Sequence, residues 1–184
     1  MGEENKKALE QQLWNIANEL RGKMDADEFR DYILGFIFYK YLSEKIENFT
    51  NELLKEDGIT FTSLDSNNPE HEEILNSLKD DCLQQLGYFL KPNELFSAMA
   101  KKGNSDNNNF ILDDLTQVLR HIESSTMGTE SEDDFEHLFE DLDLTSTKLG
   151  RTEEAKNKLI AKVLYHLDNI NFELKNHDRD VLGD

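Results

Sequence analysis

The sequence has 184 residues and is poor in cysteine, proline and valine. Its one cysteine, Cys82, excludes an intramolecular disulfide and any cysteine-based zinc or iron–sulfur cluster held by a single chain. Three valines stand against 26 leucines. Because β-branched residues favour strands and leucine favours helices, this ratio predicts a mainly helical core.

Long apolar runs are absent as well. None approaches the roughly 18 residues that a membrane-spanning helix needs. The first residues, MGEENKKALEQQ, lack the apolar region of a secretory signal, and Lys6 stands where a myristoylation signal has Ser or Thr. We therefore expect a reduced, soluble, cytoplasmic domain.

Positive charge is scarce. Twenty Lys and Arg stand against 39 Asp and Glu, which gives a net charge of −19. Such a chain repels polyphosphate at long range, so the free domain should bind DNA poorly unless another subunit supplies the attraction. Eight of the acids fall within residues 130–143. We expect a solvated acidic loop there, with a short helix that is pinned by the apolar residues Phe135, Leu138, Phe139 and Leu142.

Apolar residues at three- and four-residue spacing predict a series of helices. Capping residues are Asp25 or Asp27 for the second helix, Asn68 before Pro69, and Thr152 for the last one. The expected helices cover residues 5–21, 29–55, 69–86, 93–102, 110–123 and 153–167, and short extended pieces cover 59–62 and 87–90. The predicted fold class is mainly α, a compact helical bundle-like domain of about six to seven helices with at most short extended segments.

The helix over 29–55 is apolar on nearly all sides, which is typical of a helix buried between other elements or lying in an interface. A central core helix is the simpler interpretation, and a stack of aromatic residues around a cofactor is the least favoured. Part of this apolar surface can instead meet another subunit or domain. The candidate residues for such an interface are Trp14, Phe38, Tyr39 and Tyr41.

Motifs that would indicate catalysis are missing from the sequence. The five histidines are scattered and none pairs with another at a spacing of four residues, so a zinc site on one helix is not expected. The glycines never occur as G-x-G, so the sequence contains no glycine-rich phosphate-binding loop. The acidic pairs Asp25/Asp27 and Asp141/Asp143 lack the further ligands of a calcium loop. Cys82 lies among leucines and reads as a buried structural thiol. We predict no catalytic, metal or cofactor-binding residue in this chain.

Five stretches of the sequence form a recognisable series: LWNIANELRG at 13–22, MDADEFRDYIL at 24–34, FYKYLS at 38–43, LKPNELF at 90–96 and FEDLDLTSTKLG at 139–150. They resemble the N-terminal part of the modification (M) subunit of type I restriction–modification systems. They run in order through nearly the whole sequence.

The resemblance implies a fragment of a site-specific, adenine-N6 DNA methyltransferase that uses S-adenosylmethionine. The family's cofactor and adenine-binding motifs, D-P-x-C-G-x-G and N-P-P-F/Y, are absent here, so this fragment should not be an enzyme by itself. We expect residues 1–178 to form the helical N-terminal domain and residues 179–184 to begin the linker into an absent catalytic domain. The implied partners are that catalytic domain, the specificity subunit and a second modification subunit, with DNA bound only by the assembled complex.

The resemblance also implies a role in subunit assembly and in closing the complex around DNA. No motif assigns DNA contacts, but four basic residues are candidates: Lys101, Lys102, Lys148 and Arg151. Two other functions stay open, a free-standing acidic DNA mimic and a helical protein–protein adaptor. Mimicry is less favoured, since the acids bunch at 130–143 and elsewhere alternate with lysines.

Overall fold

Helices dominate the part of the chain that the computed structural model describes, residues 3–22, 25–105, 110–125, 139 and 142–170. The α-helices there are α1 (Glu3–Leu20), α2 (Ala26–Leu54), α3 (Pro69–Gln85), α4 (Phe96–Gly103), α5 (Leu112–Ser125) and α7 (Glu153–Asp168). Four short 3-10 turns join them, η1 (Lys55–Asp57), η2 (Phe61–Ser63), η3 (Pro92–Glu94) and η4 (Thr147–Leu149). These ranges contain no strand, and the mainly α prediction is confirmed.

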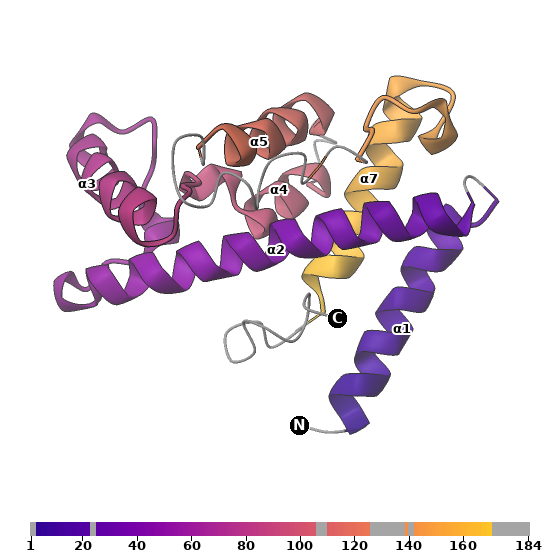
Figure 1. Cartoon of the computed structure of the whole chain (residues 1–184), viewed down its shortest axis with the longest axis horizontal. Coiled ribbons are helices and arrows are strands. Elements are labelled where there is room, and N and C mark those ends of the chain that lie inside the picture. Colours follow the sequence, from indigo (N-terminus) through magenta and orange to yellow (C-terminus); the bar gives the residue numbers. More distant parts are fainter. Residues whose placement is uncertain (1–2, 23–24, 106–109, 126–138, 140–141, 171–184) are drawn as a thin grey trace.

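The long helix α2 is the axis of the fold (Figure 1). The other helices gather around it: α3 lies at its C-terminal end, α4 and α5 lie along one side, and α7 crosses it and packs against α1 and α4. The side chains of Phe36, Tyr39 and Ile46 on α2 are fully buried. The prediction that this segment is a central core helix is therefore confirmed.

Three helix starts carry the predicted caps. The Asp25 side chain accepts the Glu28 N–H at 3.0 Å, and the Asn68 side chain accepts the N–H of Glu70, also at 3.0 Å, with Pro69 in the first helical position. Thr152 accepts the N–H of Ala155 at 3.1 Å. A short polar side chain at each site accepts a hydrogen bond from an N–H that has no partner within the helix. For this reason the three helix starts can be predicted from the sequence.

Two local predictions are wrong in part. Thr60 is extended as expected, but residues 61–62 are not, because η2 begins at Phe61, whose N–H is held at 2.7 Å by the Asn51 side chain of α2. The helix expected over 93–102 is divided into η3 and α4 by Leu95, which has extended backbone angles. The Ser43 Oγ on α2 accepts the Phe96 N–H at 2.9 Å and fixes the start of α4 there.

The N-terminal half of α2 is closed by the segment 142–150. Gly35 lies so close to Leu142 that an added Cβ would come within 2.5 Å of the Leu142 Cδ1. The Tyr32 hydroxyl donates to the Asp143 carbonyl, and burial, together with the nearby carboxylates, raises the pKa of Tyr32 to about 12. The buried Lys156 of α7 holds the same segment, donating to the Thr145 carbonyl at 2.9 Å. Backbone and side-chain groups of this segment are thus bonded within the fold.

The remaining acidic stretch falls mostly outside the described residues. Within 130–143 the structure places Phe139 and Leu142, and both are buried as expected of pinning residues. Phe135 and Leu138 lie outside the described residues, as does the predicted boundary between 178 and 179.

Candidate interaction surface

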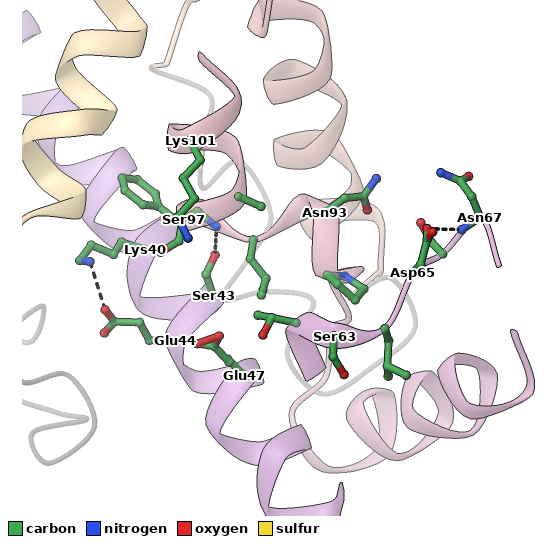
Figure 2. Close-up of a pocket in the computed structure, with 17 residues that line it drawn as sticks. Lys40, Ser43, Glu44, Glu47, Ser63, Asp65, Asn67, Asn93, Ser97 and Lys101 are labelled. Atoms are coloured by element: carbon green, nitrogen blue, oxygen red, sulfur yellow. Dashed lines mark hydrogen bonds and ion pairs between the residues drawn. The ribbon is translucent and has the colours of Figure 1, made fainter. Parts of the chain in front are cut away.

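An open groove of about 610 Å³ lies over the middle of α2, which we call the Lys40 groove (Figure 2). Residues 40–47 of α2 form its base, residues 62–67 form one wall, and residues 92–101 of η3 and α4 form the other. Its lining is mixed. The hydroxyl and amide side chains include Ser43, Thr62, Ser63, Asn67, Asn93 and Ser97, and the apolar ones are Leu64, Pro92, Leu95, Phe96 and Ala98. Charged side chains of both signs also line the groove: Lys40, Glu44, Glu47, Asp65 and Lys101.

Lys40 is unusual because its side chain is only 5% exposed. Its Nζ lies 3.1 Å from the Glu44 Oε1, one helical turn further along α2. It also lies 5.5 Å from the centre of the Phe96 ring, an arrangement that stabilises a cation. An ammonium has three donors, and within the described part of the chain these two contacts are what the structure shows for it. The groove thus has a buried charged donor at its base.

Packed aromatic side chains form the floor beneath Lys40. Phe96 is 1% exposed and packs edge-on against the Tyr39 ring, with a distance of 5.3 Å between ring centres. The Tyr39 hydroxyl donates to the Glu94 carbonyl at 2.5 Å. Burial raises the pKa of Tyr39 well above its ordinary value, so the hydroxyl keeps its proton. This packing fixes η3 and α4, and with them one wall of the groove.

Glu94 ties the same wall to α5. Its Oε1 accepts the Lys91 N–H at 2.8 Å, and its Oε2 lies 3.3 Å from the His121 Nδ1. Burial acts to raise the pKa of Glu94, but the hydrogen bonds from His121 and from the Lys91 backbone outweigh it, so the pKa is lowered. Glu94 is therefore held as a carboxylate in the folded protein.

The structure places the four candidate DNA contacts in two groups. On α4, Lys102 forms an ion pair with Asp114, while Lys101 is exposed and lines the Lys40 groove. On the connection before α7, Lys148 forms an ion pair with Glu28, which raises the pKa of Lys148, and Arg151 is exposed. Two of the four charges are thus compensated by carboxylates, and the groups do not form one basic cluster.

The four candidate interface residues divide in a different way. Trp14 is 60% exposed on α1, and Phe38 and Tyr41 are partly buried on α2, with 6.0 Å between their ring centres. Tyr39 is fully buried, and its hydroxyl is used inside the core. Within this domain Tyr39 thus faces η3 and α4, and the interface role of the four residues stays a prediction.

The Lys40 groove was not predicted from the sequence. A signal was present, since Lys40 is a single lysine inside a strongly apolar stretch and has a glutamate four residues later, the spacing of an intrahelical ion pair. The walls could not be found in this way. They come from residues 62–67 and 92–101, which only the folded chain brings to α2.

The described residues also show how metal-binding side chains and the single cysteine are placed. Among them no group of three or more His, Cys, Asp and Glu side chains is placed to hold a metal ion. Cys82 is fully buried, as predicted, and burial raises the pKa of its thiol to about 12. No described helix is long and apolar enough to cross a membrane.

The described residues define a class: a helical domain with an open groove of mixed polar and apolar lining over the middle of its longest helix. Comparison with known proteins gives the family. The HsdM N-terminal domain matches residues 9–167. The chain therefore belongs to the HsdM N-terminal domain family, and the resemblance to type I modification subunits is confirmed.

Two relatives agree with this assignment. The chain is 29% identical to the type I restriction enzyme MpnII methylase subunit of Mycoplasma pneumoniae, over 98% of this chain and 34% of that protein. It is also similar to the crystal structure of a type I restriction–modification methyltransferase subunit from Streptococcus thermophilus, with a TM-score of 0.71, 36% identity and coverage of 96% of this chain and 36% of that one. The chain spans about a third of the length of these two relatives.

Proposed function

We propose that this chain is the non-catalytic, helical N-terminal domain of a type I restriction–modification DNA methyltransferase subunit. It acts in assembling the subunits and in closing the complex around DNA. The observation that carries the proposal is the family match over residues 9–167 in a chain that covers about a third of two methylase subunits. In this proposal the complete subunit, and not this domain, binds S-adenosylmethionine and methylates adenine N6.

The charge distribution favours assembly over direct DNA binding. The chain carries a net charge of −19, and two of the four candidate cations, Lys102 and Lys148, are already paired with carboxylates. Such a surface gains little from releasing the counterions of DNA, so the closed complex should depend on other subunits for most phosphate contacts. Of the four candidates, the exposed Lys101 and Arg151 remain DNA contacts in this proposal.

A closed complex has a physical use in adenine methylation. The target base must leave the helical stack, which costs a few kcal/mol, and a protein that encloses the duplex offsets part of that cost. The partners in this proposal are the catalytic part of the subunit, the specificity subunit and a second modification subunit. The enclosing complex works in the cytoplasm, where its DNA substrate lies.

The test is a deletion in the complete methyltransferase complex. Removing the domain should lower the mass of the complex in light scattering by more than the 21.4 kDa deleted from each subunit, or reduce transfer of labelled methyl groups from S-adenosylmethionine to DNA at least tenfold. The variant Arg151→Glu should weaken DNA binding of the complex, and Arg21→Glu, an exposed residue at the end of α1, is its charge-matched control. Unchanged assembly and unchanged methylation after the deletion would refute the proposal.

A further inference from the structure

The exposed side of α7 concentrates positive charge. Lys158, Lys162 and Tyr165 follow one another at spacings of four and three residues, so they share one side of the helix, and all three are exposed. Glu154, one turn before Lys158, is the acid on this side, and the exposed Arg151 precedes the helix. We call these five residues the α7 face. It carries three cations and one acid, whereas the whole chain has 20 cations and 39 acids.

The neighbouring helices flank the α7 face without covering it. On one side, the Asn104 side chain at the end of α4 donates to the Ala161 carbonyl at 2.9 Å. On the other side, the carboxylate of Glu19 on α1 lies 3.8 Å from the Lys162 Nζ and 3.8 Å from the His166 Nε2. The α7 face therefore lies between α4 and α1 and stays open to a partner.

The lysines of this face are little compensated by carboxylates of the fold. On the buried side of α7, Lys156 is paired with Glu153 at 2.9 Å. On the exposed side, Lys158 forms no ion pair with another residue of the described chain. The contact of Lys162 with Glu19 is long, and the Lys162 side chain keeps 47% of its surface exposed. Both exposed ammonium groups are thus available to an anion outside the domain.

The residue types of the α7 face fit a phosphate backbone better than a protein surface. Lysine, arginine and tyrosine side chains all bind DNA phosphates, and cations along one helix are the electrostatic footprint of a nucleic-acid interface. The centre of a protein–protein interface is instead depleted of lysine and rich in apolar side chains. The Tyr165 ring is the large apolar group on the α7 face. Lys158 and Lys162 are about 6 Å apart along the helix axis, so they can reach neighbouring phosphates of one strand.

We propose that the α7 face binds the phosphate backbone of duplex DNA in the closed methyltransferase complex, through Arg151, Lys158, Lys162 and the Tyr165 hydroxyl. This inference rests on the proposed function, since it requires the closed complex. The net charge of −19 keeps the isolated chain from binding DNA by these few cations, so other subunits must first bring the duplex to the face. The inference adds to the proposed function the surface on which the domain meets DNA.

The test is DNA binding by the complete methyltransferase complex over a series of salt concentrations. The double variant of Lys158→Gln with Lys162→Gln loses two phosphate contacts. Its plot of log affinity against log salt concentration should be shallower by about two, and its affinity at low salt should fall at least about fivefold. The loss should be the same with and without the recognition sequence, because phosphates carry no sequence information.

Two further variants serve as controls. Lys158→Arg with Lys162→Arg keeps both charges and should keep the original slope. Lys55→Gln with Lys79→Gln removes two exposed charges from η1 and α3, at the C-terminal end of α2 and away from α7 (Figure 1), and should also leave the slope unchanged. Circular dichroism checks that each variant folds.

Each other outcome contradicts the inference in a recognisable way. An unchanged slope shows that the two lysines release no counterions from DNA, whether or not the affinity falls. A loss of mass of the DNA-free complex in light scattering assigns the α7 face to a protein subunit. If the double variant has no effect while deletion of the domain disrupts assembly, the inference fails and the proposed function stands. If the slope falls as expected while the deletion changes neither assembly nor methylation, the DNA contact stands and the proposed function fails.

Discussion

The N-terminal half and the middle of α2 differ in what lies against them. In the N-terminal half, the segment 142–150 covers the helix, and its carbonyls at Asp143 and Thr145 accept hydrogen bonds from Tyr32 and Lys156. At the middle of α2, Lys40 is also buried, but it lies beside an open groove and its contacts are the Glu44 carboxylate and the face of the Phe96 ring. Lys156 therefore holds a neighbouring segment on the fold, whereas the ion pair of Lys40 stays within one helix.

This difference separates residues whose hydrogen bonds stabilise the fold from groove residues that make no bond inside it. A hydrogen bond inside the fold contributes about 1 kcal/mol, and leaving its buried partner unsatisfied costs about 1–3 kcal/mol. Substitutions in the closed half should therefore lower the free energy of unfolding. Substitutions of groove side chains that make no internal bond should leave it nearly unchanged.

The largest effect is expected beneath the groove. Phe96→Ala should lower the free energy of unfolding by about 3–5 kcal/mol, because it leaves a cavity under Lys40 and against Tyr39. Urea denaturation followed by circular dichroism measures it. Phe110→Ala, at a position that is 40% exposed, is the control and should cost about 1 kcal/mol or less. Equal losses would mean that the groove floor is not part of the packed core.

The next effect sharpens the comparison between the two buried lysines. Lys156→Met should cost about 1–3 kcal/mol, since the Thr145 carbonyl loses its donor while the apolar stem is kept. The matched control is Lys158→Met, two residues further along α7 and exposed, with an expected change within about 0.5 kcal/mol. The same unfolding measurement applies, and a harmless Lys156→Met would remove the distinction between the closed and open halves.

A smaller effect concerns the start of the closed half. Asp25→Ala should cost about 1 kcal/mol, because the N–H of Glu28 loses its acceptor at the N-terminus of α2. Asp25→Asn keeps an acceptor of similar geometry and should remain close to the original stability. Thermal unfolding distinguishes the two, and a difference of zero between them would show that the cap does not support this helix.

The smallest effect is a pH dependence on the open side. The pKa of Glu94 is lowered in the folded protein, so its contribution to stability is complete above the ordinary value of 4.5 and is lost as the pH falls through the folded-state pKa. Glu94→Gln should make unfolding less dependent on pH between about pH 5 and about pH 3 than it is in the original protein. Parallel pH profiles for the two proteins would contradict the assigned role of the His121 and Lys91 contacts.

Local signals in the sequence predicted most of the fold. The caps at Asp25, Asn68 and Thr152 act within three residues of the helix start, and the apolar spacing of α2 acts within one or two turns, so both can be recognised from the sequence. The errors arose where a distant residue decided the local structure. Asn51 fixes η2 and Ser43 fixes the start of α4, and neither contact has a sequence signature.

The candidate site was less predictable for the same reason. Lys40 and Glu44 are neighbours on one helix, but Lys101 reaches their groove from a sequence position about sixty residues away. The exposure of a basic residue is also decided by its partners, as the pairs Lys102–Asp114 and Lys148–Glu28 illustrate. The expectation of weak DNA binding therefore depends on the net charge of −19 more than on any single lysine, and it stays a prediction.

The central claim is that this domain assembles a DNA-modifying complex without binding DNA strongly itself. The most direct test is DNA binding at low and at physiological salt, for the 184-residue chain and for the complete complex with and without the domain. The account predicts no binding by the isolated chain at physiological salt and weaker binding by the complex when the domain is removed. Tight binding by the isolated chain, with a steep dependence on salt, would contradict it.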